Sequence, residues 1–173
     1  MKKLLVIFLL FSVFYGCERD DICPESTATT PKLIIRFYDI TEQTETKRVL
    51  GLQVQGVDTD SIYQFATSTD SLALPLKTDN NITSFILHKE YAIEDSGTPD
   101  DTSDDIISGN EDIINIQYSL EEVYVSRACG YKSIYKNVEL RDEDDGDNWI
   151  KLIQIENPLT VDNETEAHVK IFH

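Results

Sequence analysis

The chain has 173 residues, with 15 Lys and Arg against 32 Asp and Glu, so its formal net charge is −17 at pH 7. An acidic field of this size repels nucleic acid and anionic lipid head groups, and it keeps a protein soluble. The composition therefore excludes nucleic acid as a partner. The chain is long enough for one domain with a sizeable core.

Residues 1–16 have the pattern of a signal peptide. Two lysines precede an apolar run over residues 4–15, and Gly16 supplies a small residue directly before Cys17. The run is shorter than the roughly 20 apolar residues that a membrane helix needs. A cysteine directly after the small residue is typical of a bacterial lipoprotein signal, whose cleavage leaves a lipidated N-terminal cysteine. We therefore expect a lipid anchor on Cys17 and a place in the cell envelope, at the outer membrane, either periplasmic or surface-exposed.

The residues around Cys17 leave two alternatives open. Phe14 occupies the position where lipoprotein signals usually have Leu, and Tyr15 the position where a small residue is commoner. An ordinary secretory signal cleaved nearby, or an uncleaved anchor, would also fit. Each acyl chain contributes about 0.8 kcal/mol per buried methylene, so the several chains of a lipoprotein would hold it durably. The mostly acidic residues 18–21 are typical either of a surface-export signal in some Gram-negative bacteria or of a solvated tether.

The three cysteines bear on the covalent structure of the chain. If Cys17 carries lipid, Cys23 and Cys129 remain, an even number in an oxidising compartment. A disulfide between them would close a loop for which chain entropy predicts a stabilisation of about 4.7 kcal/mol, less any strain. Two free thiols or a catalytic Cys129 are the alternatives. A thiol nucleophile needs a base, and no histidine lies within 35 residues of Cys129.

Short stretches with alternating apolar residues predict strands and no helix. Pro31 precedes the first stretch, Pro75 indicates an edge strand, and Gly51 indicates a bulge. In chain order, the predicted strands cover residues 32–39, 47–55, 71–76, 82–89, 113–119, 122–127, 130–136, 149–156 and 167–172. We therefore predict an all-β fold, an antiparallel β-sandwich of about eight strands, immunoglobulin-like or related. It would cover residues 31–173, behind a lipidated tether over residues 17–30.

Two acidic stretches interrupt the strands. Residues 94–112 combine low hydrophobicity with self-repelling carboxylates, which predicts a mobile loop. Residues 141–148 alternate carboxylates around Gly146 and form a calcium candidate, since calcium takes about six to eight oxygen ligands. Their spacing fails for an EF-hand, because the first and twelfth loop positions would be Arg141 and Leu152. We therefore expect a solvated turn there, with a weak divalent-cation site as the alternative.

The sequence carries no recognisable catalytic or cofactor motif. It has no G-x-S-x-G elbow, no Gly-rich phosphate loop and no C-x-x-C pair. A glycosidase would need two carboxyls held about 5–9 Å apart, one with a raised pKa, and carboxyls on a wet acidic loop are poorly placed for that. The three histidines, His88, His168 and His173, have no ligand spacing. We therefore expect no enzyme activity, no cofactor and no metal.

Aromatic residues gather in the C-terminal half, namely Tyr118, Tyr124, Tyr131, Tyr135 and Trp149. Sugar-binding sandwiches use such rings as stacking platforms, so a glycan is one candidate ligand. A sandwich core and edge of ordinary composition is the alternative, because alternation along the strands already explains several of these rings.

Four segments carry a resemblance to a known group of proteins: Cys17–Cys23 (CERDDIC), Pro31–Phe37, Ser71–Leu76 and Tyr124–Lys132 (YVSRACGYK). Together they resemble an uncharacterised family of small envelope lipoproteins from Bacteroidetes-type bacteria, over most of the domain. That family has no established activity and contributes no catalytic residues. The resemblance implies an envelope setting and fits a pairing of the second and third cysteines.

The same resemblance draws attention to two serines. Asp60-Ser61-Ile62 and Asp70-Ser71-Leu72 are similar to the Asp-Ser-aliphatic sequence at which such bacteria can O-glycosylate exported proteins. An ordinary turn or strand-start serine is the alternative at both positions.

The anchor, the strand pattern and the missing motifs lead to one functional hypothesis. We expect a non-enzymatic, lipid-anchored accessory or interaction module of the outer envelope. Its lipid would hold it to the membrane, and its partner would be an envelope protein or a glycan. The alternative is a glycan- or small-ligand-binding surface lipoprotein, which clustered exposed aromatic rings would favour and buried rings would count against.

Overall fold

The computed structural model describes residues 22–27, 29–57, 59–95, 97, 102–155 and 159–173. The predicted signal peptide over residues 1–16 and the predicted lipidated Cys17 lie outside this part of the chain. Within it the chain forms β1 (Leu33–Tyr38), β2 (Val49–Gly56), β3 (Ile62–Thr69), β4 (Ser71–Leu74), β5 (Ile82–Glu94), the 3-10 helix η3 (Thr102–Asp104), β6 (Ile106–Ser126), β7 (Gly130–Asp142), β8 (Leu152–Ile155), β9 (Thr160–Val161) and β10 (Val169–Phe172). None of the described residues belongs to a helix long and apolar enough to cross a membrane.

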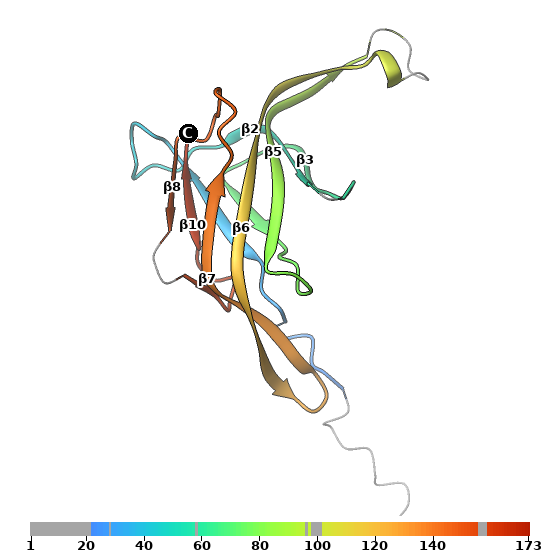
Figure 1. Ribbon diagram of the computed structural model, residues 1–173, viewed down its shortest axis with the longest axis vertical. Helices are drawn as coiled ribbons and strands as arrows, with labels where there is room; N and C mark the ends of the chain where they lie inside the picture. The colour runs from blue at the N-terminus through green and yellow to red at the C-terminus, as the bar shows by residue number, and fades with distance from the viewer. Residues whose placement is uncertain (1–21, 28, 58, 96, 98–101, 156–158) are drawn as a thin grey trace, which may run out of the picture.

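The strands form two sheets that enclose one core (Figure 1). The smaller sheet has the order β4-β1-β10-β8, and the larger has the order β3-β2-β5-β6-β7-β9. Neighbouring strands run antiparallel except β1 and β10, which are parallel. The predicted antiparallel β-sandwich is therefore confirmed, with ten strands among the described residues instead of about eight.

The core is built from alternate residues of the facing strands. Leu33, Ile35 and Phe37 of β1 are fully buried and share one face, as the alternation predicted. The larger sheet contributes the buried side chains of Leu52, Val54, Phe85, Leu87, Ile114 and Ile116. Burying one such side chain is worth about 1.5–3 kcal/mol. The two inner faces therefore supply the main stabilisation of the fold.

Strand β6 is the longest strand and runs the length of the molecule. Its 21 residues extend for roughly 65–70 Å at about 3.3 Å per residue. It pairs with β5 along its first part and with β7 along its last part. The sequence predicted two separate strands over residues 113–119 and 122–127, and a loop over residues 94–112. Those two strands are one, and the loop prediction is wrong for Glu94, which ends β5, and for residues 106–112, which belong to β6.

Both ends of β6 leave the sandwich as two-stranded hairpins, which project in opposite directions (Figure 1). We call residues 91–108 the acidic arm and residues 122–133 the disulfide arm. In the acidic arm, Ile93 lies opposite Ile107 on one face. A two-stranded ribbon encloses no core, so its sequence need not show the apolar alternation of a core strand. With no apolar alternation to indicate a strand, the acidic composition of this segment predicted a loop instead.

The acidic arm begins at a bulge that requires glycine. The β5–β6 register shifts between Lys89 and Ala92, and Glu90 has a φ of 56°. Across the ladder, Gly109 has a φ of 118°, and a Cβ on it would lie 2.5 Å from the carbonyl oxygen of Lys89. A side chain fits neither this conformation nor this close approach. The bulge therefore fixes the point where the arm leaves the sandwich.

Asp112 belongs to the core of β6, although the sequence placed it in the acidic loop. Its carboxylate accepts hydrogen bonds from the backbone N–H groups of Trp149 at 3.2 Å and Ile150 at 2.8 Å. Desolvation by burial raises the pKa of Asp112. These bonds fasten the segment after β7 to the larger sheet. The second acidic loop is also shorter than predicted, since β7 includes Arg141 and Asp142.

Candidate functional site

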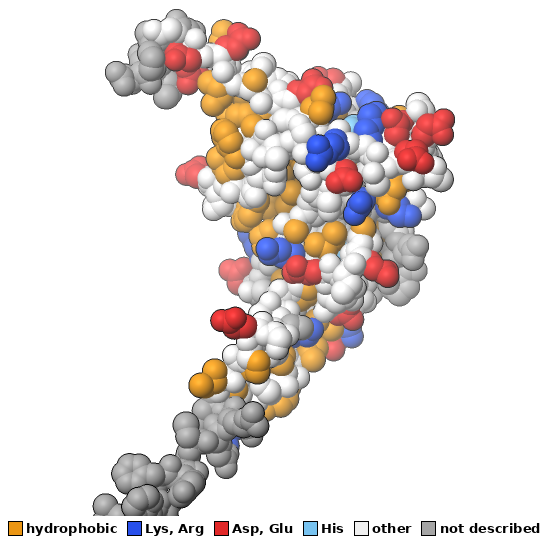
Figure 2. Space-filling model, turned by 180° about the vertical axis from the view of Figure 1, so that it is seen from behind, with side chains coloured by type: hydrophobic (Ala, Val, Ile, Leu, Met, Phe, Trp, Pro, Cys, Tyr) orange, Lys and Arg blue, Asp and Glu red, His pale blue; other side chains and the backbone are white. Residues whose placement is uncertain are grey.

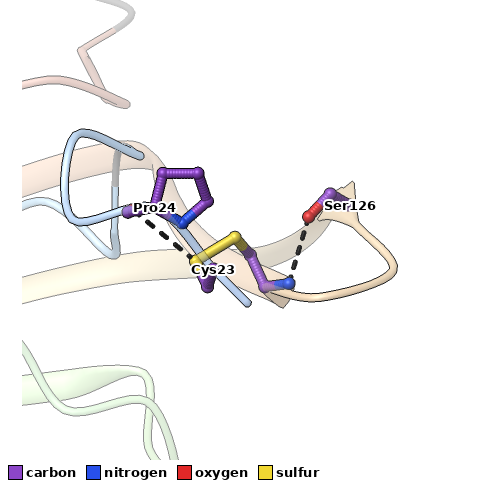
Figure 3. Close-up of a disulfide and its surroundings, with 4 residues drawn as sticks. Cys23, Pro24 and Ser126 are labelled. Carbon is purple, nitrogen blue, oxygen red and sulfur yellow. Dashed lines mark hydrogen bonds between the residues drawn. A yellow bond between two sulfur atoms is a disulfide. The ribbon is translucent and has the colours of Figure 1, made fainter. Parts of the chain in front are cut away.

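A disulfide joins Cys23 to Cys129 across 106 positions of sequence, with a Cα–Cα distance of 4.8 Å. The predicted pairing is therefore confirmed, and neither cysteine is a free thiol in this structure. Cys129 lies in the turn between β6 and β7, where its backbone N–H donates to Ser126 Oγ at 3.0 Å (Figure 3). The bond thus connects the segment at the start of the described chain to the end of the disulfide arm.

The segment after Cys23 is held along its path to β1. Thr30 Oγ1 accepts a hydrogen bond from the backbone N–H of Ser133, at 3.0 Å. The backbone N–H of Lys32 donates to Glu164 Oε1 at 2.8 Å. The predicted tether over residues 17–30 is therefore fastened at Cys23 and again near its end.

Two tyrosines lie exposed on the disulfide arm, close to the disulfide. Tyr124 and Tyr131 are opposite each other in the β6–β7 ladder, and their ring centroids are 5.4 Å apart in an edge-to-face arrangement. Tyr124 is 58% exposed and Tyr131 is 66% exposed, and Ile22 next to the disulfide is 79% exposed. We call these three residues the tyrosine tip. Ile22 and Tyr124 also line a shallow hollow of about 560 Å³.

The other three aromatic residues of the C-terminal half belong to the core. Tyr118 donates from its hydroxyl to the carbonyl of Lys77 at 2.8 Å, and Tyr135 donates to that of Leu76 at 2.9 Å. The indole N–H of Trp149 donates to the carbonyl of Leu87 at 3.0 Å. Burial raises the pKa of Tyr135 to about 12. These rings therefore form no stacking platform for a sugar, and only Tyr124 and Tyr131 of the predicted set face solvent.

An apolar surface lies at the opposite end of β6, where the acidic arm meets the sandwich. We call it the distal patch and define it as Phe65, Tyr91, Ile93 and Ile107. The rings of Phe65 and Tyr91 are 5.9 Å apart, and Ile93 pairs with Ile107. Figure 2 shows hydrophobic side chains gathered along this edge of the molecule, below the acidic arm.

The sequence interpretation missed the distal patch. The stretch that forms β3 was not predicted as a strand, although Ile62, Tyr63 and Phe65 have the β-branched and aromatic character of one. Ile107 was assigned to the predicted acidic loop over residues 94–112, and Ile93 lay just before that loop, outside any predicted strand. One sequence feature could have indicated the patch. Large apolar residues, Ile93 and Ile107, lie next to or near carboxylates at the two ends of the acidic stretch, as in the two strands of a hairpin.

A polar hollow of about 440 Å³ adjoins the patch on the outer face of the larger sheet. It is lined by Gln53, Gln55, Ile86, His88, Tyr91, Ile107, Gly109 and Glu111. His88 Nδ1 lies 3.7 Å from Glu111 Oε2. Gln53 Oε1 and His88 Nε2 are buried and have no hydrogen-bond partner among the described residues. The hollow therefore combines an aromatic ring with amide, imidazole and carboxylate groups.

The remaining histidines have structural positions. His168 Nδ1 accepts a hydrogen bond from the backbone N–H of Ile34 at 2.9 Å, and burial lowers the pKa of His168. His173 packs edge-on against Phe37 and Trp149, and burial lowers its pKa as well. Within the ranges that the structure describes, no three His, Cys, Asp or Glu side chains are grouped to hold a metal ion.

The calcium candidate after β7 forms a turn stabilised by its own carboxylates. Asp144 Oδ1 accepts from the backbone N–H of Gly146 at 3.0 Å, and Asp145 Oδ1 accepts from that of Asp147 at 3.1 Å. Acidic side chains commonly cap turns in this way. The local geometry therefore matches the expected solvated turn.

The two candidate glycosylation serines differ in their surroundings. Ser61 is exposed just before β3, and its hydroxyl lies 2.9 Å from Thr59 Oγ1. Ser71 begins β4, is half-buried, and points its hydroxyl at the carbonyl of Ile35 at 3.4 Å. Ser61 is therefore the more accessible of the two, and its modification stays a prediction.

Comparison with known proteins yields one family. A family model described as "Family of unknown function (DUF6452)" matches residues 51–173, which is 123 of the 173 residues. The matched range contains Cys129 and begins after Cys23. No curated protein and no solved structure gave a significant match.

Replacing Cys23 and Cys129 together by serine is expected to lower the free energy of unfolding by about 3–4.7 kcal/mol, because the closed loop exceeds 100 residues. Urea unfolding of the two proteins measures the difference. A reductant should destabilise the wild type by the same amount and leave the double variant unchanged. Peptide mapping without reductant should find the two cysteine peptides joined; free, alkylated thiols at both positions would contradict the pairing.

Proposed function

The chain belongs to the family of unknown function DUF6452, and we propose that it is a lipid-anchored module of the cell envelope. Its role would be to hold an interaction surface away from the membrane, without catalysis. The observation that supports this most is the position of the disulfide. It ties the segment that follows Cys17 to one end of the molecule, and the distal patch lies toward the other end.

The anchor part of the proposal rests on the sequence before Cys23. The apolar run, Gly16 and Cys17 stand in the order of a lipoprotein signal. Five residues, 18–22, lie between Cys17 and Cys23, and the six residue-to-residue steps that join the two cysteines span at most about 20 Å. A lipid on Cys17 would therefore stay close to the end of the disulfide arm, whatever path those residues take.

The interaction part rests on the distal patch. Ile107 and Tyr124 lie 17 positions apart on β6, which is about 55 Å along the strand. The patch would thus face outward from an anchored molecule. Glu94 follows Ile93 in the acidic arm, and Glu111 lies four positions after Ile107 on β6. We therefore propose a protein partner with an apolar contact surface bordered by basic groups.

A second candidate function is the binding of a glycan or another small polar ligand in the hollow beside the patch. The observation that favours it is the juxtaposition of the Tyr91 ring with Gln55, His88 and Glu111. Sugars are recognised by this combination of a stacking ring and hydrogen-bonding side chains. The hollow is lined by several polar side chains, whereas all four residues of the distal patch are aromatic or aliphatic, so a protein partner is the leading proposal.

Replacing Cys17 by alanine is expected to abolish lipidation and to remove the mature protein from the membrane, because the anchoring thiol is lost. Labelling cells with an alkynyl fatty acid and fractionating them measures both effects. Cys23→Ala is the matched control, since it also removes one cysteine and should still be labelled. A Cys17→Ala protein that is processed, labelled and membrane-bound like the wild type would contradict the anchor.

A photo-crosslinking amino acid at Ile107 is expected to capture a discrete protein partner in intact envelopes, because that side chain is exposed within the distal patch. The same amino acid at Leu152, which is exposed on β8 of the smaller sheet, is the matched control. Mass spectrometry identifies the bands. Identical products from both positions, or none from Ile107, would contradict the proposed surface. A glycan bound with an affinity that His88→Ala weakens would then favour the second candidate.

A further inference from the structure

The tyrosine tip carries a further inference, which rests on the proposed lipid anchor. We propose that Tyr124 and Tyr131 lie in the headgroup region of the membrane that the lipid on Cys17 enters. This second contact holds the molecule upright, with the acidic arm pointing away from the bilayer. The inference stands on the reach of the chain, the chemistry of the exposed side chains and the distribution of charge.

The reach of the chain brings the tip to the bilayer. Ser126 pairs with Gly130 at the end of the arm, and Tyr124 pairs with Tyr131 two positions behind. Two positions are about 7 Å along a strand. Added to the span of about 20 Å that the six steps from Cys17 to Cys23 allow, this places both rings within reach of the headgroups. No residue of the distal patch has that reach.

The chemistry of the tip suits a membrane interface. Tyrosine has an apolar ring and a polar hydroxyl, and it is enriched where the hydrocarbon region meets the headgroups. Tyr124 and Tyr131 stand exposed on a two-stranded arm, and Ile22 adds an exposed apolar side chain beside them. Arg127 in the turn between β6 and β7 can extend its charged end to lipid phosphates. The Lys132 ammonium donates to the carbonyl of Asp162 at 3.2 Å and is directed to the body of the fold.

Charge favours the same orientation. Residues 123–132 contain two basic residues and no carboxylate, whereas residues 94–105 contain six carboxylates and no basic residue. Repulsion from any anionic lipid in the membrane surface therefore acts mainly on the acidic arm. Glu25 and the mostly acidic residues 18–21 are near Ile22 in the sequence, so the proposed contact depends on the aromatic rings and on zwitterionic headgroups instead of on anionic lipid.

Because the tip is tethered to the membrane, a weak contact between the tip and the headgroups is enough to keep it bound there much of the time. A short flexible linker holds its two ends at an effective concentration in the millimolar range. Two tyrosines and one isoleucine therefore need only a millimolar affinity for the interface to be engaged much of the time. The lipid would hold the protein on the membrane, and the two tyrosine rings would set the orientation of the molecule relative to the bilayer.

The test places a tryptophan at the tip of the full lipidated protein. Tyr124→Trp is reconstituted in phosphatidylcholine and phosphatidylethanolamine vesicles with and without brominated acyl chains, which quench tryptophan at the interface. Phe65→Trp is the matched control, since Phe65 is 59% exposed and lies in the distal patch. Trp149 is buried in both variants and gives the same background. Tyr131→Trp serves as a second tip variant.

Bromination is expected to reduce the emission added by a tip tryptophan about two-fold and to leave that of Phe65→Trp unchanged, as interfacial rings require. Vesicle-bound protein whose tip tryptophans are quenched no more than the control would overturn the docking and leave the anchor standing. Protein that fails to sediment with the vesicles would overturn the anchor, and the docking with it.

Discussion

The proposed orientation of this molecule on a membrane depends on the bond between Cys23 and Cys129. Near Thr30 and Lys32, hydrogen bonds hold the N-terminal segment to the body of the fold. The disulfide adds a covalent connection at the far end of a hairpin. A group attached to the N-terminal segment is therefore held near that end of the fold. The disulfide fixes the position of this segment relative to the two sheets.

Strand β6 connects the disulfide end of the molecule to the opposite end. It runs from the acidic arm through the core to the disulfide arm, with partners on either side where it crosses the sandwich. A two-stranded hairpin is marginally stable by itself. The disulfide arm is supported by its cross-link, and the acidic arm is directed by the bulge at Glu90 and Gly109. The two ends of one strand thus have different supports and different surfaces.

The sandwich could be predicted from sequence because its strands bury one face. In β1 and β10, alternate residues such as Leu33, Ile35 and Ile171 are apolar, and the structure buries them. The cysteine pairing followed from an even count once Cys17 was set aside. These are properties that a core or a covalent bond imposes directly on the residues involved.

The acidic arm and the distal patch could not be predicted in the same way, although the strands of the disulfide arm were. A ribbon outside the sandwich has no buried face that would impose apolar alternation on its sequence, and in the acidic arm the carboxylates predicted a loop. Asp112 was assigned to the acidic loop because its neighbours are charged, yet its two backbone donors come from Trp149 and Ile150, 37 and 38 positions away. The distal patch joins Phe65 to Tyr91 through ring contact between separate strands. Such juxtapositions arise only when the sheet has formed.

In the proposed arrangement, the tyrosine tip contacts the membrane and the distal patch is the interaction surface. The most direct test of that arrangement is the thickness of the protein layer on a supported bilayer, measured by neutron reflectometry with the lipidated full chain. An upright molecule should give a layer of about 60 Å or more, set by the length of β6. A layer less than half as thick, with the strand lying along the bilayer, would contradict the account.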